Sequence, residues 1–294
     1  LLVSWAAQTP QSNRSFSAGA SRIVPGSAGE TAKNTLINTY NWTITDGGNT
    51  TNFTQPYVYS INTSMPGEGT ASQYTLPQGI DSYYTATFSD GQQFTNTYGG
   101  NVVTFAAPGV YDVSIVGSFT LEESLYENDP EYLKIVEIKA WGNMIIKGLY
   151  RTFYECRNLQ KVTATSSPNI DPSVTSVQSL FNRSGVADIS FVRQWDVSNI
   201  TDFRSMFDSL DLATLGASAD LSGLDVSSAV TMQYMFYGNT FGGAERSMNL
   251  SNWNMPNLTN ARDMFNNNRF LAELNITGWS TPSLIDMSRF AFYA

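Results

Sequence analysis

Apolar residues in the second half of the chain return at a fixed spacing. A Trp stands 12 positions before a Phe at Trp141 and Phe153, at Trp195 and Phe207, and at Trp253 and Phe265. Weaker copies place Asn169 before Phe181, Leu224 before Phe236, and Trp279 before Ala291, with Phe290 one position early. The anchor positions 153, 181, 207, 236, 265 and 291 are 26 to 29 residues apart. A period of this length predicts a solenoid, in which each unit buries its apolar face only against its neighbours.

The pattern inside one repeat predicts a short strand, a loop and a helix of two or three turns. Apolar residues at Ile200, Phe203, Met206 and Phe207 fall on one face of a helix. Three of these segments follow a Thr suited to capping a helix: Thr201, Thr231 and Thr259. The alternation in 274–276 suits a strand. We expect the large rings to form a core ladder: Trp141, Phe153, Phe181, Trp195, Phe207, Phe236, Trp253, Phe265 and Trp279.

Strand and turn signals dominate the first 120 residues. The alternating run 83–88 leads into a tight turn at Asp90-Gly91, and the Pro108-Gly109 turn leads into an alternating run. Residues 40–45 also suit a strand that enters a turn. The apolar start, 1–7, is too short to span a membrane. We expect it to be an ordinary first strand, or else a strand given to a neighbouring subunit.

The repeat carries a family resemblance. The segment 195–207, Trp-Asp-Val-Ser-Asn-Ile-Thr-Asp-Phe-Arg-Ser-Met-Phe, resembles the surface-protein repeat of BspA-like leucine-rich-repeat proteins, the DUF285 group, and its pattern returns at 253–265. The resemblance covers residues 131–294. It implies a right-handed α/β solenoid of the leucine-rich-repeat type on a cell surface, in a secreted protein or on a virion. The roles it implies are adhesion and recognition, without catalysis. Two copies depart from the pattern, because 165–190 lacks the Trp and 208–224 carries an insertion.

A second resemblance concerns residues 74–120, which are similar to the PKD-type immunoglobulin-like β-sandwich. The usual Trp-Gly-Asp-Gly of that module appears here as Phe88-Ser89-Asp90-Gly91. The chain is therefore expected to be multidomain. Its parts would be a β-rich N-terminal region or arm at 1–73, an immunoglobulin-like module at 74–120, an acidic hinge at 121–135, and the repeat solenoid at 136–294.

Composition narrows the class of partner. The net charge is −9 and only 14% of residues are charged, which argues against nucleic acid and anionic membranes as partners. A single cysteine, Cys156, excludes an internal disulfide, and we expect it to be a buried structural thiol. The last repeat opens at 284–291 without a polar cap, so we expect a piece of a longer protein or an end that docks on another subunit.

Catalysis is not expected. The chain has no His, which excludes Ser-His-Asp and Cys-His arrangements and imidazole metal ligands. A paired-carboxylate glycosidase remains formally possible, since Asp196 and Asp225 share a repeat position, but stacked acids on a solenoid favour a solvated edge. No cofactor is expected. Candidates for calcium are Asp90, Glu122 and Glu123, and the alternative is a solvated acidic hinge.

Asparagine supplies candidate modification sites. Ten Asn-x-Ser/Thr sequences occur, at Asn13, Asn41, Asn49, Asn52, Asn62, Asn182, Asn199, Asn249, Asn257 and Asn275. Such sequences accept N-glycans where the host has the machinery. The alternative is that a turn in the repeat favours Asn, since Asn199 and Asn257 occupy the same repeat position.

These features predict a non-enzymatic extracellular surface protein that uses a solenoid for adhesion to glycans or proteins of a host or neighbouring cell. The alternative is a structural subunit of a filament, appendage or virion fibre that assembles with itself through its repeats and N-terminal strands. Partner contacts are expected first in the irregular parts, at Tyr237, Phe241 and Arg269, because loops carry function.

Overall fold

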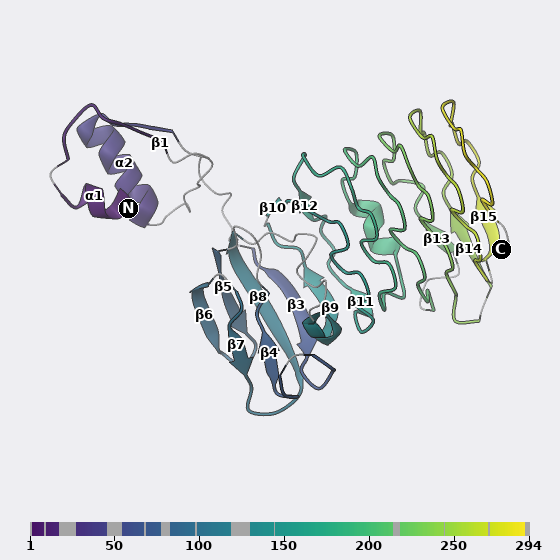
Figure 1. Cartoon of the computed structure of the whole chain (residues 1–294), viewed down its shortest axis with the longest axis horizontal. Helices are drawn as coiled ribbons and strands as arrows, with labels where there is room; N and C mark the ends of the chain where they lie inside the picture. The colour runs from purple at the N-terminus through teal and green to yellow at the C-terminus, as the bar shows by residue number, and fades with distance from the viewer. Residues whose placement is uncertain are drawn as a thin grey trace. The chain divides into compact units, whose positions relative to one another are not determined.

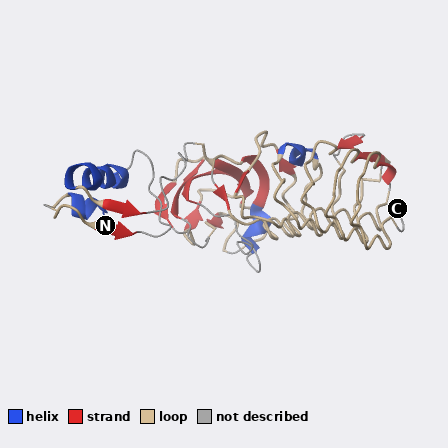
Figure 2. Cartoon of the chain, turned by 90° about the horizontal axis from the view of Figure 1, so that it is seen from above, coloured by secondary structure: helices blue, strands red, loops and turns tan. Residues whose placement is uncertain are grey.

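The computed structural model describes residues 2–8, 10–17, 28–45, 55–67, 69–77, 83–97, 99–118, 130–143, 145–213, 218–243, 245–269 and 271–291. The described part is mostly strand, turn and loop, with two α-helices near the N-terminus (Figure 1, Figure 2). The chain divides into two compact units, residues 1–55 and 56–294. Among the described residues, no helix has the length and apolar character needed to cross a membrane.

The first unit contains α1 (Leu2–Ala6), β1 (Ser15–Ser17), α2 (Ala28–Tyr40) and β2 (Thr43–Thr45), and β1 pairs in parallel with β2. The ring of Trp5 lies 5.0 Å from that of Phe16 and 5.5 Å from that of Trp42. α2 buries Ala32 and Leu36, which lie one helical turn apart. The expected first strand at 1–7 is wrong, because residues 2–6 are helical. The β-rich prediction for 1–73 therefore holds only in part.

The second unit begins with a six-stranded sheet in the order β11-β9-β3-β8-β5-β6. Its strands are β3 (Tyr57–Asn62), β5 (Tyr83–Phe88), β6 (Gln93–Thr97), β8 (Val110–Ser118), β9 (Ile135–Ala140) and β11 (Lys161–Val162). All neighbours are antiparallel except β11 and β9. The turns predicted at Asp90-Gly91 and Pro108-Gly109 are confirmed, since each leads between or into these strands.

A two-stranded antiparallel pair, β4 (Gln73–Thr75) and β7 (Val102–Thr104), packs against this sheet. The hydroxyls of Tyr59 and Tyr74 lie 3.1 Å apart, and the rings of Phe88 and Phe105 are in contact at 5.5 Å. All four side chains are buried. The apolar positions that alternate along β3, β5 and β8 thus make one core with the pair β4–β7.

The predicted boundary at residue 73 is wrong, because β3 lies at the centre of the sheet between β8 and β9. The boundary near 136 also differs, since β9 pairs with β3 on one side and with β11 of the repeats on the other. The sheet and the repeats therefore share a strand. Of the predicted hinge at 121–135, residues 121–129 lie outside the described residues, and Pro130–Lys134 form a 3₁₀ helix.

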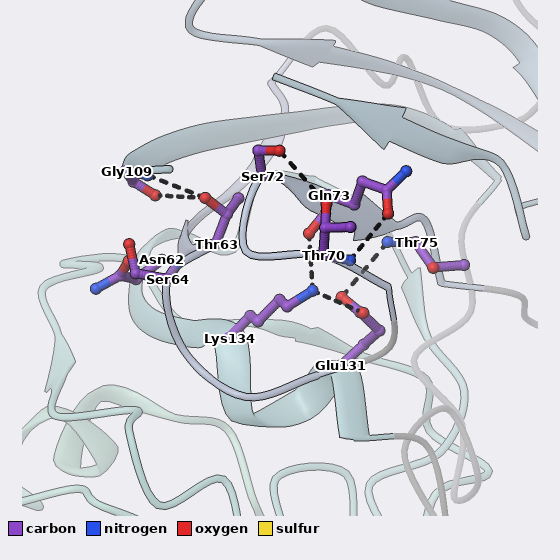
Figure 3. Close-up of polar contacts among 10 residues, drawn as sticks. All are labelled: Asn62, Thr63, Ser64, Thr70, Ser72, Gln73, Thr75, Gly109, Glu131 and Lys134. Carbon is purple, nitrogen blue, oxygen red and sulfur yellow. Dashed lines mark hydrogen bonds and ion pairs between the residues drawn. The ribbon is translucent and has the colours of Figure 1, made fainter. Parts of the chain in front are cut away.

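A buried ion pair fixes this 3₁₀ helix to β4 (Figure 3). The ammonium of Lys134 lies 2.9 Å from the carboxylate of Glu131 and donates to the carbonyl of Gln73 at 2.7 Å. The second Glu131 oxygen accepts from the Thr75 N–H at 3.4 Å. Both charged side chains are 1% exposed, so their mutual pairing and backbone contacts offset their desolvation.

The repeats stack as successive coils, each named here by its anchor Phe (Figure 1). Their short strands pair only in parallel: β10 (Ile145–Ile146) with β12 (Asn169–Ile170), and β13 (Ser218–Asp220) with β14 (Arg246–Asn249), which pairs with β15 (Leu271–Asn275). Single parallel bridges join equivalent residues in a row: Ser176, Asp202, Thr231, Asn260 and Asp286. Each coil therefore pairs with the next in the register that the 26–29-residue period predicts.

The helix predicted in each repeat is wrong. Among the described residues of the second unit there is no α-helix, and the only helical segments are the short 3₁₀ helices Pro130–Lys134 and Ser190–Gln194. The Thr residues expected to cap helices serve the coils instead. The hydroxyls of Thr201 and Thr259 donate to the carbonyls of Thr175 and Val230 in the preceding coil.

Candidate recognition surface on the stacked coils

The coils turn sharply around each anchor. We call the residues from four before to two after the anchor the anchor corner: 149–155, 177–183, 203–209, 232–238 and 261–267. In the Phe207 coil, the N–H groups of Phe203, Ser205, Phe207 and Ser209 donate to carbonyls of the next coil. The N–H groups between them donate within the coil, Met206 to Phe203 and Asp208 to Ser205. The same alternation recurs in the neighbouring coils, and it satisfies the backbone without a helix.

Two residues in each anchor corner adopt the left-handed conformation. They lie two before and two after the anchor, for example Ser205 with φ 51° and Ser209 with φ 58° in the Phe207 coil. The position two residues after the anchor is occupied by Glu155, Arg183, Ser209, Gly238 and Asn267. Only Gly adopts this conformation without strain, so the stacking of coils holds the other residues in place.

A row of polar side chains sets the start of each corner. Ser176, Asp202, Thr231, Asn260 and Asp286 each accept a hydrogen bond from the N–H two residues later. This is the local turn that Asp, Asn, Ser and Thr favour. The row fixes the direction in which the following side chains leave the backbone.

The predicted core rings line the interior. Neighbouring anchors stack with nearly parallel planes, from Phe153–Phe181 at 5.3 Å to Phe236–Phe265 at 5.0 Å. Trp141, Trp195 and Trp253 are also buried, whereas Trp279 is partly exposed and stacks on Trp253 at 5.8 Å. The rings therefore occupy one continuous core that faces away from solvent.

The side chains three residues before the anchors point outward from the stack. They are Tyr150, Gln178, Arg204, Gln233, Arg262 and Ser288, and all are partly or fully exposed. The chain thus combines a uniform interior with a varied exterior at equivalent positions. The row can be recognised in the sequence from its constant offset to the anchors, whereas a prediction based on irregular loops does not include it.

The partner contacts expected from sequence divide in the structure. Phe241 is 1% exposed, so this prediction is wrong: its ring belongs to the core under the turn at 242–243. Tyr237 is partly exposed on the anchor corner of the Phe236 coil, and Arg269 is exposed beyond the next corner. The structure therefore does not bring these three residues together into one surface.

In the described residues, Cys156 and the candidate acidic side chains take part in packing or in local turns. Cys156 is buried, as predicted, and burial raises the pKa of its thiol above the ordinary value. Hydrogen bonds from Ser198 lower the pKa of Asp196. Asp196 and Asp225 each accept a hydrogen bond from the N–H two residues later, that of Ser198 and of Ser227, and so stabilise local turns. Asp90 accepts from the Gln92 N–H in the β5–β6 turn. Glu122 and Glu123 lie outside the described residues, and in the described part no group of three acidic or thiol side chains is placed to hold a metal.

The candidate glycan acceptors differ in exposure. Asn182 is a wrong prediction, because it is 9% exposed and its amide donates toward Asp208. The amides of Asn249 and Asn275 form a ladder, donating to Asp220 and Asn249 respectively, which supports the turn-forming alternative for these two. Four acceptors are exposed: Asn13, Asn41, Asn199 and Asn257. Asn62 is partly exposed, and Asn49 and Asn52 lie outside the described residues.

Comparison with known proteins gives one result for the repeats. The sequence model of a family described as "Mycoplasma protein of unknown function, DUF285" matches residues 125–240 and again 175–294. Together the two matches extend over more than half of the chain and include every coil. No curated protein and no solved structure matches the chain.

Proposed function

From the premise that this chain belongs to the DUF285 family, we propose that it is a non-enzymatic recognition protein that acts in adhesion outside the cell. The observation that carries this proposal is the contrast between the two sides of the coils. The anchor is Phe in every coil from Phe153 to Phe265, while the outward position three residues earlier is Tyr, Gln, Arg, Gln and Arg. A scaffold that keeps its interior fixed and varies its exterior suits the display of side chains to a partner.

We infer that the coils are a turn-rich variant of a leucine-rich-repeat solenoid, and that the sheet with the pair β4–β7 is a PKD-type immunoglobulin-like sandwich. The two-layer packing through Tyr59–Tyr74 and Phe88–Phe105 supports the second assignment. The parallel pairing of equivalent residues along the coils supports the first.

The experiment that tests adhesion uses the full chain immobilised on a sensor and, in parallel, free in solution. We expect saturable binding to at least one of a panel of extracellular glycans and matrix proteins, together with a monomer in sedimentation velocity. Assembly into long polymers combined with no binding to any member of the panel would contradict the proposal.

A further inference from the structure

A cluster of tyrosine and arginine side chains covers the outer face of the first coils. In the Phe153 coil, the guanidinium of Arg151 lies 4.7 Å from the ring centroid of Tyr154 and 5.7 Å from that of Tyr150. Both rings are partly exposed. Cation–π contact on this scale holds the rings in defined orientations at the surface. The cluster therefore presents aromatic surface that is ordered and reachable.

Two further guanidiniums stand on the following coils. Arg204 binds the carboxylate of Asp202 through both Nε and Nη2, with contacts of 2.6–3.1 Å, and its side chain remains 44% exposed. Arg183 reaches Glu155 of the preceding coil at 3.3 Å and is 56% exposed. Each ion pair uses only some of the five N–H donors of its guanidinium. The acid partner holds each guanidinium in place and offsets much of its positive charge. The remaining N–H donors are left at the surface.

The aromatic surface returns three coils later. Tyr234 and Tyr237 in the Phe236 coil contact each other edge to face, with centroids 5.4 Å apart, and both are partly exposed. The equivalent positions in the two coils between them hold shorter side chains: Ser179 and Asn182, then Ser205 and Asp208. Tyrosine pairs thus bracket a stretch of short side chains, of which Ser179 and Asn182 are buried, and the exposed Arg183 and Arg204 stand in that stretch.

The repeat of this surface matches an extended sugar polymer. Parallel coils pair at a spacing of about 5 Å, which is close to the advance of one pyranose ring in an extended glycan. Sugar rings stack their C–H faces on aromatic rings and direct their hydroxyls to planar donors and acceptors. Because Arg183 and Arg204 are already paired with the acids Glu155 and Asp202, the chemistry favours an uncharged polyhydroxyl chain over a strongly acidic one.

We infer that the face formed by Tyr150, Tyr154, Arg183, Arg204, Tyr234 and Tyr237 binds a neutral glycan chain along the axis of the coils. This inference rests on the proposed recognition function and names its ligand class. The tyrosines supply the stacking surfaces at the two ends, and Arg183, Arg204 and Asp208 supply hydrogen bonds between them. The site is confined to the coils from Phe153 to Phe236, because the next coil holds Asp263 and Asn266 at the positions of Tyr234 and Tyr237.

The test measures binding of the full chain to hexamers of β-1,4-linked glucose and N-acetylglucosamine by calorimetry. An alternating uronic-acid hexamer and an acidic peptide serve as competing ligand classes. Tyr154→Ala and Tyr237→Ala should each weaken binding of the neutral hexamer by roughly tenfold. Tyr154→Phe should retain binding, because the ring that stacks is kept. Arg193→Ala is the matched control, since it removes an exposed guanidinium from another segment.

The outcomes separate the site from the function. Thermal unfolding of each variant establishes that the coils are intact before binding is compared. If a neutral hexamer binds and both tyrosine variants bind it as the wild type does, the inferred site is wrong and recognition stands. If only the acidic ligands bind this face, or no hexamer binds at all, the ligand class is overturned. Polymer formation without any ligand would instead contradict the proposed function itself.

Discussion

The left-handed residues beside each anchor are the least expected feature at the residue scale. At the position two residues after the anchor, glycine occurs once, at Gly238 with φ 67°. A Cβ added to Gly238 would approach the Ser209 hydroxyl to 3.4 Å. In the equivalent positions the coils hold side chains as large as Arg183. The fold therefore accommodates strain at these positions instead of avoiding it, and the energy comes from the stacked core.

Gly238→Ala should destabilise the protein by about 1 kcal/mol, because the left-handed conformation disfavours a Cβ by that amount. The measurement is the free energy of unfolding in denaturant. Gly223→Ala is the matched control, since an added Cβ there meets no atom within 4 Å and the backbone is not left-handed. Equal effects of the two substitutions would show that the conformation at Gly238 carries no strain.

Asp208 provides a test with pH. Burial raises the pKa of its carboxyl, and hydrogen bonds from Ser209 and Ser205 only partly oppose this. A folded-state pKa above the unfolded value, which is about 3.9, means that stability falls as pH rises through the folded pKa. Asp208→Asn should therefore unfold at a higher temperature than the wild type at pH 7, and the difference should shrink toward pH 3. A less stable variant at pH 7 would mean that the hydrogen bonds outweigh desolvation.

At the scale of the element, the ring ladder carries the cohesion between coils. Phe207 stacks on Phe181 and on Phe236 and is fully buried, whereas Phe290 contacts Phe265 and Trp279 and is partly exposed. Phe207→Ala should cost about 3–5 kcal/mol. Phe290→Ala should cost about 1 kcal/mol, because less ring surface leaves water on folding. Equal losses in chemical denaturation would show that neighbouring coils do not support one another.

The sequence predicts only those features of the coil that core packing requires, namely the period and the buried anchors. The period and the anchors are visible because each coil needs a large ring at the same place in the core, as at Phe181 and Phe236. The apolar spacing at 200–207 fits a helix, but two successive tight turns give the same buried positions. Residues such as Tyr234 carry no glycine-like signal for the left-handed backbone. The helix was therefore indistinguishable from the real corner by periodicity alone.

The candidate site was predictable to a smaller degree. The sequence singles out Tyr237 because it lies in an irregular part of the repeat, but Tyr150 and Arg204 emerge as neighbours only when successive coils are aligned by their anchors. Phe241 was misplaced since its segment looks irregular, while in the structure it is fully packed. Exposure depends on which residues of adjacent coils cover each other, and that is decided by tertiary packing.

At the scale of the whole molecule, the two units differ in the size of their cores. The described residues of unit 1–55 bury only Ala32 and Leu36 completely, whereas the sheet and coils of 56–294 share one strand and a long list of buried side chains. A unit with so few buried contacts opens locally at low free energy.

Limited proteolysis with a broad-specificity protease should therefore cut within residues 1–55 first. The expected product is a resistant fragment that begins near residue 56, identified by intact mass. The fragment should unfold in one cooperative transition, because β9 joins the sheet to the coils. Early cuts inside 150–290 would contradict this order of stability.

The alternating hydrogen bonds of the coils also decide how charge is distributed along the stack. In the anchor corners every inter-coil N–H points toward the following coil, as from Phe181 to Met206. In the row of Thr201 and Thr259 the N–H groups point toward the preceding coil. The peptide dipoles of the two sides therefore partly offset each other, unlike those of an α-helix, whose dipoles all add. Each added coil brings its own opposing dipoles, so the dipole of the stack grows less with each added residue than that of an α-helix would.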